Sequence, residues 1–414
     1  MSTSNRWLHA VALALAMPAA AQQPVFPPAP TAHGGARVEV VAEGLKDPRG
    51  MTLGARGEIY VAEAGTTTGV FALPKVFDPG AGPPYTWEPS EPPTATRCEV
   101  YWPVGPVTAG YSSSIARIDR NGTVTRIATD LPSAANNLLI GGDHLGASAV
   151  AQAGERLYAL LSGGGCSHGH PSEPNGLVRV RGDGTTTTIA DLSNYLRTNP
   201  DSKDPTGSDF EPDGVWYALV RAFGDFYAIE PNRGVLVRIT DRGAITLVAD
   251  LIAGAASIRP DGDGDQTWPT LVRHRGAFYV ATLGTIPGDF GASVYRVARD
   301  GSSMKLVASG LRGVLGLAFD RRGRLYALET TQAGVDPPLS DPTAGRLVRI
   351  ERNGSLTPIV TGLAFPTALI PGRRGEFYVT NCGYHCDDPP GSGVSASVGQ
   401  VLRIVVPGAH ADPD

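Results

Sequence analysis

Several features that mark other classes of protein are missing from this sequence. It has no run of basic residues that could neutralise a nucleic-acid backbone, lysine is nearly absent beside arginine, and a net charge of -5 is spread without pattern. We therefore expect no nucleic-acid partner. The motifs Gly-x-Ser-x-Gly and His-Glu-x-x-His and the phosphate-binding loop are also absent, so no familiar catalytic motif indicates a reaction.

Long apolar segments are missing too, apart from one near the N-terminus. Arg6 precedes an apolar run over residues 8–17, and small residues ending at Ala21 follow it. Roughly ten apolar residues are too few for a bilayer core, which needs about 20. The pattern predicts a secretory signal over residues 1–21, cleaved before Gln22, and a proline-rich disordered lead-in over residues 22–36. We expect a periplasmic or secreted protein with no membrane span after cleavage.

Six similar units follow one another through residues 37–410, and residues 411–414 form a short tail. Each unit contains short β-type runs separated by Arg-Gly, Asn-Gly or Asp-Gly turns, and 52 Gly and 35 Pro agree with many strands and turns. We interpret each unit as four strands, A to D. The B strands share an apolar residue followed by Tyr, at Tyr60, Tyr158, Tyr227, Tyr279, Tyr326 and Tyr378. The C strands share an Arg, at Arg117, Arg179, Arg238, Arg296, Arg349 and Arg403. Six four-stranded antiparallel sheets predict an all-β protein, a six-bladed β-propeller in one domain.

The two ends of the repeated region predict how the ring closes. The last unit stops after its C strand, residues 400–406, and lacks a D strand. Residues 37–45 precede the first unit and resemble the D strand that ends at Leu363. An N-terminal strand that completes the last blade would leave no exposed sheet edge.

Residues that recur in every unit are expected to build the scaffold, so function should lie where the repeat is interrupted. The long interruptions follow B strands or D strands. In an antiparallel four-stranded blade these connections leave by the same end of the ring, which we call the mouth. The mouth is therefore the predicted functional face.

Several of these interruptions resemble the ScyD/ScyE family of exported bacterial proteins. The motifs that carry the resemblance are residues 163–169, residues 209–217, Glu230-Pro231-Asn232, Pro269-Thr270, residues 316–320 and residues 378–383. The resemblance covers nearly all of residues 37–406. It implies a propeller related to NHL-repeat and gluconolactonase-like proteins, and it implies no established reaction.

The ends of the B strands supply candidate ligand-binding residues at the mouth. Polar residues stand three positions after five of the six repeated Tyr residues, and Asn232 follows one of them. The candidates are Glu63, Glu230, Asn232, Thr282, Glu329 and Asn381. One interpretation is an acidic rim that attracts a cation or hydrogen-bonds a polyol. The other is that each Glu caps or pairs with an Arg of a neighbouring blade, and it is favoured because structural ion pairs are common.

All four cysteines lie in B–C interruptions. Because the chain is expected to be exported, an even number of cysteines favours disulfides, Cys382–Cys386 within one loop and Cys98–Cys166 between two blades. The alternative is a metal site that adds His168, His170 and His385 to these cysteines. Asp261, Asp263 and Asp265 alternate as in a calcium loop, but the required Gly and Glu are missing, which favours a solvated turn.

Two functions agree with these features. The first is a monomeric propeller without a cofactor that binds a small molecule, a glycan or a protein at its mouth. The second is a lactonase-like hydrolase assisted by a divalent metal such as calcium, and it rests on analogy of fold. The residues that open the inner strands include Arg49, Asp213, Thr270 and Thr367, and these do not form a metal-binding set. Binding is therefore the leading hypothesis, and no residue is predicted to be catalytic.

Overall fold

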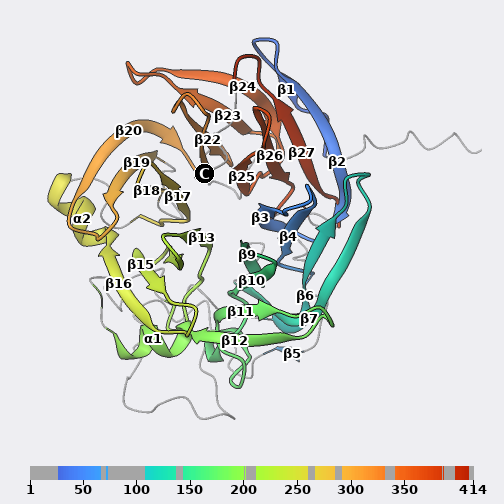
Figure 1. The fold of residues 1–414 in the computed structure, drawn as a ribbon, viewed down its shortest axis with the longest axis vertical. Helices are drawn as coiled ribbons and strands as arrows, with labels where there is room; N and C mark the ends of the chain where they lie inside the picture. Colours follow the sequence, from blue (N-terminus) through green and yellow to red (C-terminus); the bar gives the residue numbers. More distant parts are fainter. Residues whose placement is uncertain are drawn as a thin grey trace, which may run out of the picture.

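The computed structural model confirms the six-bladed propeller (Figure 1). It describes residues 27–66, 71–72, 108–136, 143–199, 201, 211–259, 266–284, 291–331, 341–384, 386 and 397–409. The predicted signal over residues 1–21 lies outside this part of the chain. Within the described residues, no helix is long and apolar enough to cross a bilayer.

Each blade is an antiparallel sheet whose A strand lies next to the axis of the ring. Blade 1 contains β3 (Pro48–Leu53), β4 (Ile59–Glu63), β6 (Thr108–Ile118) and β7 (Val124–Asn136), with β5 (Phe71–Ala72) and β8 (Asp143–Leu145) added. Blade 2 contains β9 (Ala147–Ala153), β10 (Arg156–Leu161), β11 (Gly176–Val180) and β12 (Thr186–Asp191). Blade 3 contains β13 (Ala218–Ala222), β14 (Asp225–Glu230), β15 (Val235–Ile239) and β16 (Ile245–Asp250).

The remaining blades have the same order. Blade 4 contains β17 (Thr270–His274), β18 (Ala277–Ala281), β19 (Gly291–Ala298) and β20 (Met304–Arg312). Blade 5 contains β21 (Val314–Phe319), β22 (Leu325–Glu329), β23 (Gly345–Ile350) and β24 (Leu356–Leu363), with β1 (Thr31–Ala32) at its outer edge. Blade 6 contains β25 (Ala368–Pro371), β26 (Glu376–Asn381), β27 (Gly399–Val405) and β2 (Arg37–Leu45).

The N-terminal strand closes the ring as predicted. Strand β2 pairs antiparallel with β27, from Arg37 opposite Val405 to Leu45 opposite Gly399. Figure 1 shows β2 beside β27 at the seam with blade 1. The prediction of disorder over residues 22–36 is wrong for part of the lead-in, because β1 pairs with β24 and the His33 side chain lies 2.8 Å from the Thr361 hydroxyl group.

The repeated residues occupy matching positions within each blade. The Tyr of every B strand stands directly opposite the Arg of its C strand, from Tyr60 and Arg117 to Tyr378 and Arg403. Polar and aromatic residues directly opposite each other stabilise neighbouring strands. The repeated pairs are thus cross-strand partners inside the blades.

Tight turns and capped helices follow from local sequence. In the C–D turns the side chain of Asn121 or Asp183 accepts the backbone N–H two residues later, and the following Gly has a positive φ, 85° at Gly122 and 86° at Gly184. Helices α1 (Leu192–Thr198) and α2 (Leu251–Ile258) both follow D strands that end Ala-Asp. In each, the Asp side chain caps the helix, accepting the N–H of Asn194 or Ala253.

The additional elements gather at the mouth, as predicted. Helices α1 and α2 and strand β8 lie in D–A connections, whereas β5 and the 3-10 helix η2 (Cys166–His168) lie in B–C connections. Glu63, the last residue of β4, stands opposite Ser114, and six residues of β6 precede Ser114. Strands β6 and β7 of blade 1 therefore continue beyond the end of β4. This extension of β6 and β7 forms a wall on the mouth side of blade 1.

Candidate functional site at the mouth

The three glutamates are buried, so the interpretation as an exposed rim is wrong and the burial agrees with the capping interpretation. Glu63, Glu230 and Glu329 each have 0% exposed surface. The Glu63 carboxylate accepts the Lys46 backbone N–H at 2.9 Å, and the Glu329 carboxylate accepts that of Arg312 at 2.7 Å. Each therefore satisfies a backbone donor in the connection between two blades, and this is the alternative role that the sequence allowed.

The arginine partners of these glutamates differ from those expected. Glu63 pairs with Arg126 at 2.9 Å and Glu329 pairs with Arg346, and neither Arg belongs to the repeated set. Ligand binding by the glutamates stays a prediction. Their observed contacts lie within the scaffold. A buried carboxylate that contacts an Arg and a backbone N–H has its charge already compensated.

Glu230 holds the connection between blades 2 and 3. Its carboxylate accepts the backbone N–H groups of Val215 at 2.8 Å and Arg233 at 2.6 Å. Burial raises its pKa to about 7, although both N–H groups and the Arg233 charge oppose this shift. Asn232, next to Arg233, is half-buried.

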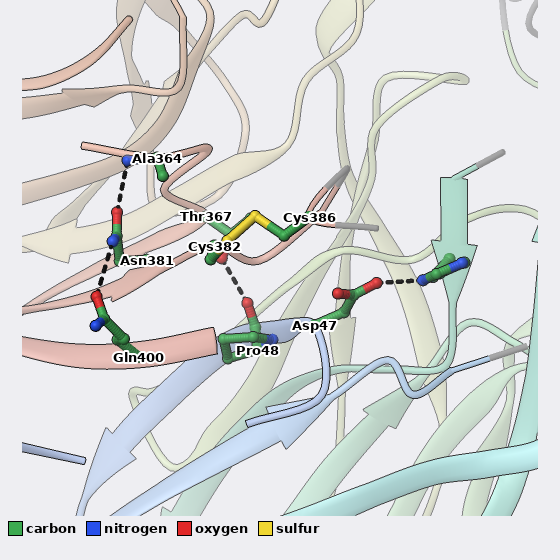
Figure 2. Close-up of a disulfide and its surroundings, with 9 residues drawn as sticks. Asp47, Pro48, Ala364, Thr367, Asn381, Cys382, Cys386 and Gln400 are labelled. Carbon is green, nitrogen blue, oxygen red and sulfur yellow. Dashed lines mark hydrogen bonds and ion pairs between the residues drawn. A yellow bond between two sulfur atoms is a disulfide. The ribbon is translucent and has the colours of Figure 1, made fainter. Parts of the chain in front are cut away.

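Thr282 and Asn381 end the B strands of blades 4 and 6. The Thr282 hydroxyl group accepts the Ser293 N–H at 2.9 Å. Asn381 accepts the Ala364 N–H at 2.8 Å and donates to Gln400 at 3.1 Å (Figure 2). Both are buried and lie in equivalent places to Glu63, but only Asn381 supports a D–A connection, because Ser293 belongs to the C strand β19.

The predicted disulfide Cys382–Cys386 is present, with 5.8 Å between the Cα atoms (Figure 2). Both cysteines are buried beside Phe365, and Tyr384 packs against the same cluster. Cys166 is also disulfide-bonded. Cys98, its predicted partner, lies outside the described residues.

The alternative metal sites are not supported where the structure describes them. His168 contacts the Gly164 carbonyl oxygen through Nδ1 and the Glu211 carboxylate through Nε2, so both ring nitrogens are engaged. His170 contacts the Ser133 carbonyl oxygen and Glu173. Among the described residues no group of three or more His, Cys, Asp or Glu side chains could hold a metal ion. His385, Asp261, Asp263 and Asp265 lie outside them.

A buried ionic cluster unites two motifs of the family resemblance. The Asp213 carboxylate accepts both the backbone N–H and the hydroxyl group of Ser167 at 2.8 Å, and it pairs with Arg197 of α1. Beside it, His168 contacts Glu211 at 2.8 Å. Burial lowers the pKa of His168, but the hydrogen bond and charge of Glu211 outweigh this effect and raise it above its usual value. Motifs 163–169 and 209–217 thus meet through side chains.

Sequence reasoning missed a buried side-chain contact at the mouth, between Asp47 and Nδ1 of His144. Both side chains are buried, and Arg49 donates to the His144 carbonyl oxygen at 2.7 Å. Asp47 has a positive φ of 47°. A residue other than Gly rarely adopts this conformation. The Asp47 carboxylate reaches His144 of β8. The Lys46-Asp47-Pro48 turn is the feature of the sequence that could have indicated this conformation of Asp47.

The wall on blade 1 presents an exposed aromatic side chain that contacts the B–C connection of blade 2. Tyr111 is 45% exposed, its hydroxyl group donates to Glu173 at 2.6 Å, and its ring meets His170 edge-on at 4.9 Å. The hydrogen bond to Glu173, with burial and the charge of Glu173, raises the pKa of Tyr111 to about 12. Tyr111 is therefore a neutral, oriented ring that is partly exposed.

Comparisons with known structures confirm the fold and do not show a function. A Bacteroides thetaiotaomicron protein of unknown function is similar, with a TM-score of 0.50 and 10% identity over 89% of this chain and 76% of that chain. A luciferin-regenerating enzyme is similar, with a TM-score of 0.50 and 10% identity over 91% of this chain and 98% of that chain. A virginiamycin B lyase from Staphylococcus aureus has a TM-score of 0.44 and 12% identity over 90% of this chain and 99% of that chain. No protein-family model and no curated protein matches the chain.

Proposed function

We propose that this protein is an exported, ScyD/ScyE-like binding propeller whose mouth, over blades 1 to 3, holds a polar small molecule or the end of a glycan. The observation that carries this proposal is Tyr111. It is the one aromatic side chain among the large exposed hydrophobic residues in the described part of the chain, and Glu173 and His170 fix its orientation. A rigid aromatic face with a polar end is a common anchor for ligands.

Three pairs of polar and charged groups at the mouth support the same location. Asp47–His144, His168–Glu211 and Asp213–Arg197 lie on neighbouring blades and do not follow the repeat. The loop that carries His168 packs close to strand β8, because a Cβ atom at Gly163 would come 2.8 Å from the Leu145 carbonyl oxygen. Buried ion pairs often stabilise no more than apolar packing would, so a cluster that the blades do not need indicates a function.

The ligand chemistry follows from these groups. The partly exposed Glu173 carboxylate can hydrogen-bond hydroxyl groups, and the exposed ring of Tyr111 suits the apolar face of a sugar ring. A hydrolase assisted by a metal ion has no donor set among the described residues. Binding of a hydroxyl-rich ligand is therefore the proposed function.

A printed glycan array tests this proposal with the purified, oxidised protein. The wild type should bind a defined group of glycans, and Tyr111→Ala should lose that binding. Leu247→Ala is the matched control, since Leu247 is 46% exposed on the outer strand of blade 3 and away from the mouth cluster. An array without binding, or binding that Tyr111→Ala retains, would contradict the proposal.

A further inference from the structure

The end of the ring opposite the mouth has an uneven distribution of charge. We call this end the turn face, because the A–B and C–D turns of the blades form it. The A–B turns of blades 1 to 3, residues 54–58, 153–156 and 222–225, contain two arginines and three acidic residues. Those of blades 4 to 6, residues 274–277, 320–324 and 372–376, contain six arginines and two acidic residues. Positive charge is thus concentrated on one half of the turn face, although the whole chain has a net charge of -5.

The exposed charges on the A–B turns of blades 4 to 6 are all positive. The two acidic residues, Asp320 and Glu376, are buried. Asp320 pairs with Arg324, and the Glu376 carboxylate accepts the Arg374 backbone N–H at 2.9 Å. The exposed residues are Arg275, Arg321, Arg322, Arg373 and Arg374. A molecule that approaches these turns therefore meets guanidinium groups and no exposed carboxylate of the same turns.

Three of these arginines form a continuous series from blade 4 to blade 1, which we call the arginine arc. The Arg275 guanidinium group lies against the blade 5 turn, because a Cβ atom at Gly323 would come 3.2 Å from it. Arg321 of blade 5 donates to the Arg373 carbonyl oxygen of blade 6 at 3.0 Å. Arg373 in turn donates to carbonyl oxygens of the blade 1 turn, 54–58, at 2.7 and 3.0 Å.

Neutral partners hold the arginine arc in place and leave its charge uncompensated. In the described part of the chain, no carboxylate pairs with Arg275, Arg321 or Arg373. Charges of one sign that are fixed close together create a local potential that attracts the opposite charge. The arginine arc is therefore a surface with an electrostatic attraction for anions.

The turns themselves do not require arginine at these positions. Blades 1, 5 and 6 close their A–B turns with the same backbone hydrogen bond, at 2.7–3.1 Å, donated by Gly54, Asp320 and Gly372. Arg321 and Arg373 each directly follow the donor, at the position that Ala55 occupies in blade 1. Arg275 has a φ of 46° and corresponds to Phe223 of blade 3, whose φ is 52°. Alanine and phenylalanine thus serve in the same turns, so the arginines have a role beyond turn formation.

We propose that the arginine arc binds a carboxylated polysaccharide, such as a chain of uronic acids, across blades 4 to 6. Guanidinium and carboxylate groups match in geometry and charge, and guanidinium groups on three separate blades fit a ligand whose charges repeat along its length. The turns lack the groups that other polyanions use. Bases of single-stranded nucleic acids stack on aromatic side chains, and membrane-bound faces insert apolar side chains. In the described residues no large exposed hydrophobic side chain belongs to an A–B turn.

Calorimetric titration with sodium oligogalacturonate tests this surface in the wild-type protein. The fully methyl-esterified oligomer is the control ligand, because it has the same sugars without the charges. The charged oligomer should bind at least tenfold more tightly than its ester, and its affinity should fall severalfold from low to high salt. No binding, or equal affinity for the ester, would overturn the proposal. Equal or tighter binding of phosphatidylglycerol vesicles or duplex DNA at the same salt would also overturn it, in favour of a lipid or nucleic-acid partner.

A pair of triple variants then locates the binding surface. Replacing Arg275, Arg321 and Arg373 with Gln should weaken oligogalacturonate binding at least tenfold. The control replaces three exposed arginines of blades 2 and 3 on the same face with Gln, and it should change the affinity less than threefold; these are Arg156, Arg181 and Arg242. Equal losses in both triple variants would show that net charge, and not the arginine arc, attracts the ligand. Thermal melts check that both variants are folded.

This inference can fail independently of the proposed function at the mouth. Tyr111 lies at the opposite end of the ring, so Tyr111→Ala should leave the affinity for oligogalacturonate unchanged. Loss of that affinity in Tyr111→Ala would place the uronate at the mouth and contradict binding by the arginine arc.

Discussion

The Tyr217 hydroxyl group lies 3.5 Å from the carbonyl oxygen of Thr367, on the blade half-way round the ring. Tyr217 directly precedes β13 and Thr367 directly precedes β25, so one side chain spans the axis between blades 3 and 6. This contact joins the mouth ends of two opposite blades.

Tyr217→Phe should have little effect on folding. A distance of 3.5 Å is beyond the usual range for O–H···O hydrogen bonds, so loss of the hydroxyl group should lower the free energy of unfolding by less than about 1 kcal/mol. Denaturant unfolding measures this difference. A loss of several kcal/mol would show that the hydroxyl group has a strong structural role.

Glu63→Gln should destabilise the protein by about 1.5–3 kcal/mol, the range for hydrogen bonds to charged groups. The change leaves Arg126 without its carboxylate and weakens the contact to the Lys46 N–H. Glu155→Gln in an exposed turn is the control and should change stability by less than about 0.5 kcal/mol. If the two variants melt at the same temperature, Glu63 does not stabilise the scaffold.

Glu230 should give the protein a pH-dependent stability. Its pKa rises from 4.5 to about 7 on folding, so the folded state holds this proton more tightly than the unfolded state. The contribution is fully present below pH 4.5 and is lost as the pH rises through 7, by about 3 kcal/mol in all.

Glu230→Gln resembles the protonated side chain at every pH. The variant should match the wild type near pH 4.5 and exceed it in melting temperature at pH 8. Parallel melts of both proteins from pH 4 to 8 measure this difference. A constant difference across that range would contradict a raised pKa.

The disulfide Cys382–Cys386 should fix the loop beside Phe365. In the chain-entropy model a loop of this length stabilises the folded state by about 2 kcal/mol. Replacing both cysteines with Ser should lower the unfolding free energy by about that amount. Titration of the denatured, unreduced protein should find no free thiol, and four titrating thiols would contradict both disulfides.

Much of the fold could be predicted because its signals are local and repeated. The missing last D strand predicted that residues 37–45 complete blade 6, and β2 has these bounds. The repeated Tyr and Arg residues predicted the B and C strands. The Tyr of each B strand stands directly opposite the Arg of its C strand, so each pair belongs to one strand register. β1 was missed because its pairing with β24 depends on contacts far apart in the sequence.

The site was harder to predict than the fold. The repeat predicted that Glu63 and Glu329 end B strands. The burial of their carboxylates depends on the side chains of Arg126 and Arg346, which come from other strands. The Asp47–His144 contact joins residues 97 positions apart through a rare backbone conformation. Motifs 163–169 and 209–217 did indicate where the ionic cluster lies, although not which side chains pair.

The central claim is that ligands bind at the mouth over blades 1 to 3, and Tyr111 tests it most directly. Isothermal titration of the strongest-binding array glycan into the wild type, Tyr111→Ala and Leu247→Ala measures the contribution of this ring. The account predicts at least tenfold weaker binding for Tyr111→Ala and less than a twofold change for Leu247→Ala. Equal affinities of all three proteins would contradict it.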